Sequence, residues 1–116
     1  MKPSKNKPVS FNSGWRIFTI KTVKDLTEDG EKCWGRTDFD RAIISLESFM
    51  NQETYRETLL HEVTHVVLET VGFGSDENIT GTNENLTVQV SRGLLQAFNL
   101  NKELFEYLLN TEEGDL

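Results

Sequence analysis

Two histidines that flank a glutamate are the residues of this chain whose types and spacing could do chemistry. His61, Glu62 and His65 form the pattern HExxH, and the chain contains no other histidine. Side chains four residues apart lie on neighbouring turns of one helical face, so both imidazoles could bind one zinc ion. Glu62 would lie about 100° further round the helix, within reach of a water on that metal. Zinc acidifies such a water and a carboxylate removes its proton, which is the chemistry of metal-assisted hydrolysis.

The helix that must carry this pattern has a clear apolar periodicity. From Asn51 onward, apolar residues recur at the spacing of an α-helix, and Gly72 can end it. The alternative to a metal site is an exposed pair of histidines on the polar side of this helix. Because LLHEVTHVVL is apolar around most of the helix, simple solvation of His61 and His65 is disfavoured, and we prefer the metal site.

A catalytic zinc normally takes three protein ligands and keeps one position open for water. With both histidines used, the third ligand must be acidic or Cys33. The extended pattern HExxHxxGxxH is not met, because Leu68 and Val71 occupy its glycine and third-histidine places. Glu84 is our candidate, because it begins the next predicted helix on the side that carries the apolar residues, where a carboxylate needs a partner. The alternative is that Glu84 only complements the helix dipole.

Other possible ligands are weaker. Glu69 lies on the same helix as the histidines and would struggle to close a tetrahedral site with them. Asp76 and Glu77 fall in a glycine-rich polar loop, where acidic residues usually face solvent. Cys33 fits better as a small buried thiol.

Alternation of side chains predicts a short sheet before this helix. Residues 15–23 (WRIFTIKTV) alternate along a strand, and CWGRT and RAIISLE can each supply another. Asp29 and Gly30 form a turn signal between them. The first half of the chain is therefore expected to form three short strands.

Two more helices are predicted after the HExxH helix. Asn83 can cap a helix that runs from Glu84 to about Phe98, and KELFEYLLN predicts a last one. The fold class is therefore α+β, with a short three-stranded sheet packed on the HExxH helix and two further helices.

The length of 116 residues suits one small domain. We expect residues 1–14, which hold both prolines and few apolar groups, to be a flexible arm. Residues 15–110 would form the single domain, and residues 111–116 an acidic tail.

The net charge limits the classes of partner that we expect. A net charge of -7 argues against binding to a phosphate backbone, so nucleic acid is disfavoured as a partner. No apolar run approaches the roughly 20 residues of a membrane-spanning helix, and the first residues lack the apolar region of a signal peptide. The single cysteine suits a reducing compartment. We expect a cytoplasmic protein without a membrane partner.

The HExxH segment and the segments around it resemble the minimal zinc metallopeptidases of the ImmA/IrrE and SprT-like kinds. Many members of these families are carried by phages and mobile elements. The resemblance spans residues 33–98 and rests on GRTDFDRAIISLE, ETLLHEVTHVVLE and ENLTVQVSRGLLQAF, in that order. It implies a zincin-like fold, with His61, His65 and Glu84 as metal ligands and Glu62 as general base. SprT-like proteins usually finish with a third histidine, which this chain lacks, so the ImmA/IrrE-like or gluzincin side is favoured.

The resemblance also implies a place for the substrate. In that family the strand before the active helix is an exposed edge that pairs with an extended peptide, which would give residues 42–46 this role. An ordinary core strand is the alternative for these residues. Arg36 and Arg41 flank the strand and could contact substrate, although surface arginines without a special role are commoner. Tyr55 is expected in the core, and nothing in the sequence directs Tyr107 to the metal.

Two functions of different classes follow. The first is a zinc-dependent peptidase in which Glu62 activates a metal-bound water against a peptide bond of a protein or peptide substrate. The second is a zinc-stabilised interaction protein whose acidic surface binds a partner, such as a host regulatory protein, without catalysis. A metal-dependent hydrolase of non-peptide substrates is a third, weaker alternative.

Overall fold

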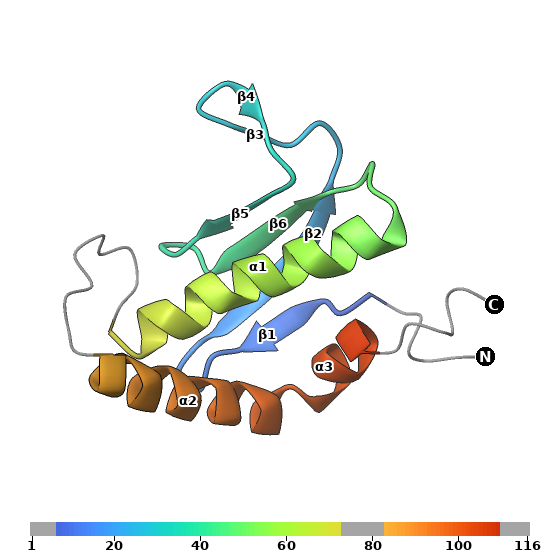
Figure 1. Ribbon diagram of the computed structural model, residues 1–116. Helices are drawn as coiled ribbons and strands as arrows, with labels where there is room; N and C mark the ends of the chain where they lie inside the picture. Colours follow the sequence, from blue (N-terminus) through green and yellow to red (C-terminus); the bar gives the residue numbers. More distant parts are fainter. Residues whose placement is uncertain (1–6, 73–82, 110–116) are drawn as a thin grey trace.

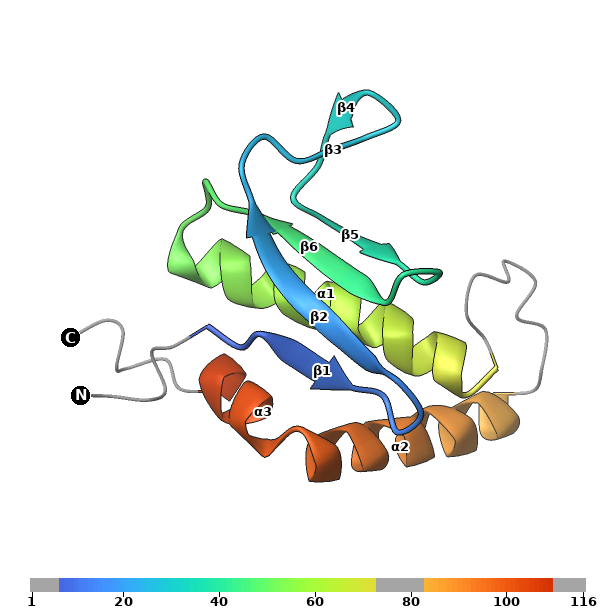
Figure 2. The ribbon, with the colours of Figure 1, turned by 180° about the vertical axis from the view of Figure 1, so that it is seen from behind.

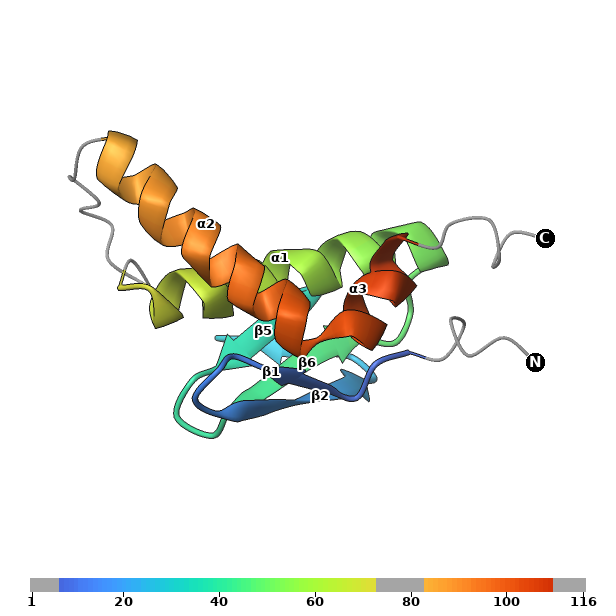
Figure 3. The same cartoon turned by 90° about the horizontal axis from the view of Figure 1, so that it is seen from below.

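The computed structural model describes residues 7–72 and 83–109, with the side chains of residues 83–88 outside that description. Its described elements form two layers, a mixed β-sheet and a layer of helices on one of its faces (Figures 1 and 3). The strands are β1 (Ser10–Asn12), β2 (Ile17–Val23), β3 (Thr27–Glu28), β4 (Glu31–Lys32), β5 (Gly35–Asp38) and β6 (Ile43–Glu47). The helices are α1 (Gln52–Thr70), α2 (Asn83–Leu100) and α3 (Lys102–Leu109). The expected α+β class with three helices is confirmed.

The main sheet has four strands in the order β1-β2-β6-β5, not three as expected. β1 and β2 are antiparallel, β2 and β6 are parallel, and β6 and β5 are antiparallel. The parallel pair requires a crossover, and the chain between β2 and β6 supplies the β3–β4 hairpin and the edge strand β5. Figure 2 shows the sheet face that carries no helix.

The fourth strand comes from the segment expected to be a flexible arm, and that expectation is wrong for residues 10–12. Phe11 pairs with Phe18 of β2 and is completely buried. The amide side chain of Asn101, at the junction of α2 and α3, accepts a hydrogen bond from Asn12 N and donates one to Asn12 O. The three residues of β1 are too few to show an alternation of polar and apolar side chains in the sequence. The long-range contacts with β2 and Asn101 hold the strand in place.

Residues 42–46 do not form an exposed edge, which corrects the expectation drawn from the family resemblance. Strand β6 is hydrogen-bonded to β2 on one side and to β5 on the other, and Ile44 and Leu46 are completely buried. The strand on the edge next to α1 is β5. Sequence order placed β6 directly before the helix, but strand order in the sheet depends on pairing between distant segments.

Helix α1 begins and ends as its sequence predicts. The side chain of Asn51 caps the first turn by accepting a hydrogen bond from Thr54 N at 2.8 Å. Gly72 follows the helix with a φ of +99°, a left-handed conformation that suits glycine at a helix end. One face of α1 packs on the sheet with the buried residues Tyr55, Leu59, Val63, Val66 and Val67. These contacts give the HExxH segment a rigid support.

The hairpin of β3 and β4 turns at Asp29 and Gly30, as expected. Both residues have positive φ angles, 55° and 83°, which is the conformation of a tight two-residue hairpin turn. The hairpin projects from the main sheet beyond β5 (Figure 1). In the described parts of the chain, no helix is both long enough and apolar enough to cross a membrane.

Candidate functional site

The two histidines of α1 converge on one point at the surface. His61 Nε2 and His65 Nε2 lie 3.1 Å apart, and both side chains are exposed. Two nitrogens bound to one tetrahedral zinc at about 2.0–2.1 Å lie about 3.3 Å from each other, so this spacing fits chelation. Without a metal, the same spacing suits a hydrogen bond in which one ring donates its N–H to the other. The pair can therefore supply two ligands with little rearrangement.

Glu62 points in a different direction, toward the sheet. Its side chain is only 6% exposed, and Thr37 Oγ1 of β5 donates a hydrogen bond to Glu62 Oε1 at 2.6 Å. A hydroxyl that donates to a carboxylate at this distance makes a strong, charge-assisted bond. One oxygen of Glu62 is thus held by Thr37 of β5. Sequence reasoning missed Thr37, because the face of a strand toward which a residue points depends on register.

A glycine allows α1 to approach β5 this closely. A Cβ atom on Gly35 would lie 2.8 Å from Thr58 Cγ2 and 3.2 Å from Glu62 Cγ. Gly35 and Thr37 are two residues apart on β5, so both present the same face to α1. The sequence signal for Gly35 was a glycine within a predicted strand, which is typical of a close approach by another segment.

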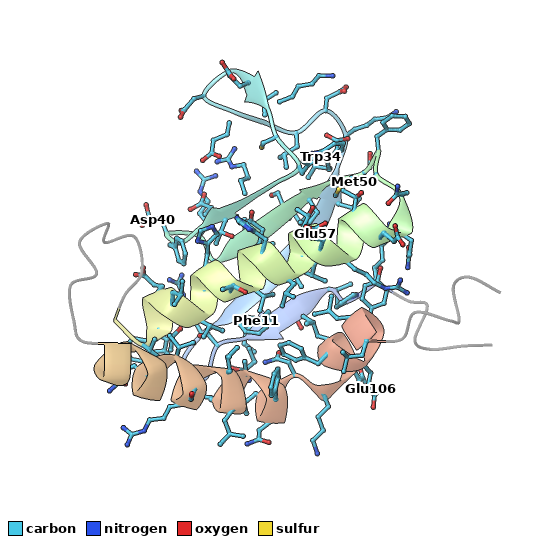
Figure 4. All side chains as sticks on the ribbon, viewed as in Figure 1. Phe11, Trp34, Asp40, Met50, Glu57 and Glu106 are labelled. Carbon is cyan, nitrogen blue, oxygen red and sulfur yellow. The ribbon has the colours of Figure 1, made fainter. Side chains whose placement is uncertain are left out.

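A groove of about 410 Å³ opens between β5 and α1. Trp34 and Gly35 line it from the side of β5, and Glu57, His61 and Glu62 line it from α1. In Figure 4, Trp34 and Glu57 lie on the same side of α1, between that helix and the projecting hairpin. The groove therefore joins the candidate base, one candidate ligand and the edge strand.

The free backbone of β5 faces outward at this groove. Glu47 N donates to Trp34 O at 2.8 Å, and hydrogen-bonded pairs alternate along an antiparallel ladder. The N–H and C=O groups of Gly35 and Thr37 consequently point away from β6. At the opposite edge of the sheet, the outward groups of Asn12 are taken by the side chain of Asn101. β5 is thus an edge of the sheet that can pair with a further strand.

The expected third ligand lies outside the side chains that the structure describes. Glu84 belongs to the first turn of α2, and its side chain lies outside the described residues, as do Asp76 and Glu77. Among the described residues, no group of three or more histidine, cysteine and acidic side chains could hold a metal ion. Glu69 is exposed and Cys33 is half-buried. Neither side chain forms a metal-binding group with His61 and His65.

Both tyrosines belong to the core. Tyr55 Oη lies 3.2 Å from Thr22 Oγ1, and Tyr107 Oη accepts a hydrogen bond from Gln52 Nε2. Burial raises the pKa of each phenol above its ordinary value, and the hydrogen bond to each opposes that change. Neither tyrosine lines the groove, so neither is placed to stabilise an oxyanion there.

The two arginines near β5 have structural partners. The guanidinium of Arg36 donates from Nη1 to Thr27 O of the hairpin at 3.3 Å. Arg41 donates its backbone N–H to Asp38 Oδ1 in the turn after β5. Neither side chain lines the groove.

Comparison of this chain with protein-family models, with curated proteins and with solved structures finds no match.

Proposed function

We propose that this protein is a small zinc-dependent peptidase of zincin-like fold. The observation that carries the proposal is the convergence of His61 and His65 beside a buried Glu62 that faces a groove along a free strand edge. Glu84 is the proposed third ligand, since α2 follows α1 and packs against it. Two imidazoles and a carboxylate are a typical ligand set for a catalytic zinc.

The zinc ion would supply an acidified, polarised water and a positive charge for the developing oxyanion. Glu62 would serve as the general base in this chemistry. Thr37 holds Glu62 Oε1, and Glu62 is one of the residues that line the groove. Because β5 packs against α1, the strand lies directly beside the base.

The proposed substrate is an extended peptide segment that pairs with β5. The outward N–H and C=O groups of Gly35 and Thr37 can form a ladder with its backbone, which would align a peptide bond beside Glu62. Main-chain pairing is independent of side-chain identity, so it gives alignment but no sequence selectivity.

The substitution Glu62→Gln tests the mechanism. Glutamine keeps the size of the side chain and an oxygen that accepts from Thr37, but it cannot take a proton at neutral pH. We expect the variant to bind zinc as the wild type does and to lose peptide hydrolysis by at least about 100-fold, the usual contribution of a general base. The measurement is cleavage of a labelled peptide mixture, with zinc content determined in parallel. Hydrolysis that persists in Glu62→Gln would contradict this role.

A second candidate is a zinc-stabilised interaction protein that does no catalysis. The net charge of -7 and the exposed apolar side chains of Leu95 and Phe98 on α2 favour a partner-binding surface. This candidate predicts that metal removal unfolds the domain and that Glu62→Gln retains full biological effect.

A further inference from the structure

A second cavity lies at the beginning of β5, outside the groove that holds Glu62. Its volume is about 550 Å³, and it is bounded by the base of the β3–β4 hairpin and by the turn between β6 and α1. Two large apolar side chains line it although they are poorly covered: Trp34 is 54% exposed and Phe49 is 86% exposed. Exposed aromatic residues that meet at one cavity are typical of a binding surface.

The Glu47 carboxylate forms hydrogen bonds to both walls of this cavity. Glu47 at the end of β6 accepts a hydrogen bond from Leu26 N at 2.7 Å with Oε1 and one from Phe49 N at 3.1 Å with Oε2. Leu26 O in turn accepts from Cys33 N at 3.1 Å, and Leu26 itself is buried. The hairpin base and the turn that carries Phe49 are therefore held in place before any ligand arrives, which reduces the entropy lost on binding.

The cavity is adjacent to the groove beside α1, because Trp34 lines both. Trp34 precedes Thr37 by three residues on the same extended segment, a separation of about 10 Å. A peptide that pairs with β5 beside Glu62 would thus bring a side chain two to four residues further along its own chain to this cavity. Figure 4 shows Trp34 between the hairpin and the N-terminal half of α1, where such a peptide would pass.

We propose that this cavity is a selectivity pocket that receives a bulky apolar side chain of the peptide paired with β5. The proposal rests on the function proposed for the groove, and it adds the side-chain preference that main-chain pairing cannot provide. The cavity is lined by Trp34 and Phe49 at its apolar walls and by Lys24, Asp25, Lys32 and Glu47 around them. Because these charges are of both signs, the pocket selects for apolar character and not for charge.

Cys33 contributes a wall to this pocket and not a nucleophile. Burial, followed by the negative charge of Glu28, raises the pKa of the Cys33 thiol above its ordinary value. The thiol therefore stays protonated at neutral pH, and a protonated thiol is a small apolar surface.

The test measures peptide binding in the full chain carrying Glu62→Gln, so that the peptides survive the experiment. The probes are two end-blocked, fluorescein-labelled peptides of about ten threonine and serine residues, identical except for a central phenylalanine or alanine. Fluorescence anisotropy gives the two dissociation constants. We expect the phenylalanine peptide to bind at least about tenfold more tightly, as burial of a large apolar side chain implies.

Three variants test whether the pocket causes the preference for the phenylalanine peptide. The ratio of the two dissociation constants should fall below about threefold in Trp34→Ala and in Phe49→Ala. It should remain unchanged in Trp15→Ala, a matched control that removes a tryptophan 82% exposed at the turn between β1 and β2. Phe49 is almost fully exposed, so its variant folds even if Trp34→Ala does not. A ratio near one in the parent protein, or a ratio that survives both pocket variants, would overturn the proposal.

The same peptides given to zinc-loaded wild type separate this proposal from the function on which it rests. Preference for phenylalanine without cleavage would leave the pocket standing and contradict the peptidase. Cleavage of both peptides at equal rates would leave the peptidase standing and contradict the pocket.

Discussion

The contact between Thr37 and Glu62 joins the edge strand to the candidate base at a single hydrogen bond. Glu62 is almost fully buried, and the 2.6 Å bond from Thr37 Oγ1 is the partner the structure shows for its carboxylate. A buried carboxylate without a partner is costly, so this bond matters both for stability and for the orientation of the base. Removing Thr37 Oγ1 should therefore show in both properties.

We expect Thr37→Val to lower the free energy of unfolding by about 1–3 kcal/mol, because valine keeps the shape of threonine but leaves the Glu62 carboxylate without a donor. Peptide hydrolysis should fall as well, since the base is no longer held. Urea unfolding and cleavage rates measure the two effects. Thr37→Ser is the matched control, since it keeps the hydroxyl and should restore most of both. Equal stability in the valine and serine variants would show that the hydrogen bond does not matter.

Some residues of the candidate site could be singled out from the sequence and others could not. His61, Glu62 and His65 were found because their spacing on a helix depends only on local geometry. Thr37 was missed because its partner is 25 residues away in sequence and its direction is set by the register of β5 with β6.

At the scale of elements, β5 and α1 form the frame of the groove, and Gly35 determines how closely they approach. A Cβ at this position would lie 2.8 Å from Thr58 Cγ2, closer than real contacts allow. The Thr58 side chain would have to move, or α1 and β5 would have to lie further apart. The close approach of these two elements therefore depends on the absence of a side chain at Gly35.

Gly35→Ala should lower the free energy of unfolding by about 1–3 kcal/mol, the usual effect of forcing extra volume into a packed interface. In a Thr58→Ser background the loss should be smaller, because serine lacks the Cγ2 atom that the new methyl group meets. A double-mutant cycle by urea unfolding gives the coupling between the two positions. Additive effects would contradict the close contact.

Some helices, strands and turns can be predicted from their own sequences, and others cannot. The periodicity of α1 and the Asp29–Gly30 turn are local signals, and each was confirmed. β1 was not predicted, because its three residues are held by long-range contacts from Asn101 and by the burial of Phe11. The edge was assigned to residues 42–46 and not to β5, because the order of strands is not contained in any one segment.

At the scale of the whole molecule, both tyrosines link the sheet and the helices through one core. Tyr55 is 2% exposed and bonds to Thr22 of β2, and Tyr107 is 1% exposed and bonds to Gln52 of α1. The Lys7 ammonium lies 4.3 Å from the centre of the Tyr55 ring, and the Arg56 guanidinium lies 5.3 Å from that of Tyr107. Burial favours the neutral phenol in both cases.

Stability should therefore fall at alkaline pH. Because the folded-state pKa of each tyrosine is raised above its ordinary value of 10.0, the unfolded chain loses its phenolic protons first as the pH rises. The contribution of these groups is fully present below about pH 10 and is lost as the pH rises through their folded-state pKa values. The urea midpoint should drop above about pH 10, and less steeply in Tyr55→Phe than in the wild type. Parallel pH profiles for the two proteins would contradict this assignment.

Zinc stoichiometry of protein purified without added metal or a polyhistidine tag tests the central claim most directly. We expect one zinc per chain in the wild type, loss of that zinc in His61→Ala and in His65→Ala, and weaker binding in Glu84→Ala. Gln96→Ala serves as a control, since its side chain bonds to Ser13 O and not to the site. Wild-type protein that carries no zinc and takes up none on titration would contradict the metal site, and with it the proposed peptidase.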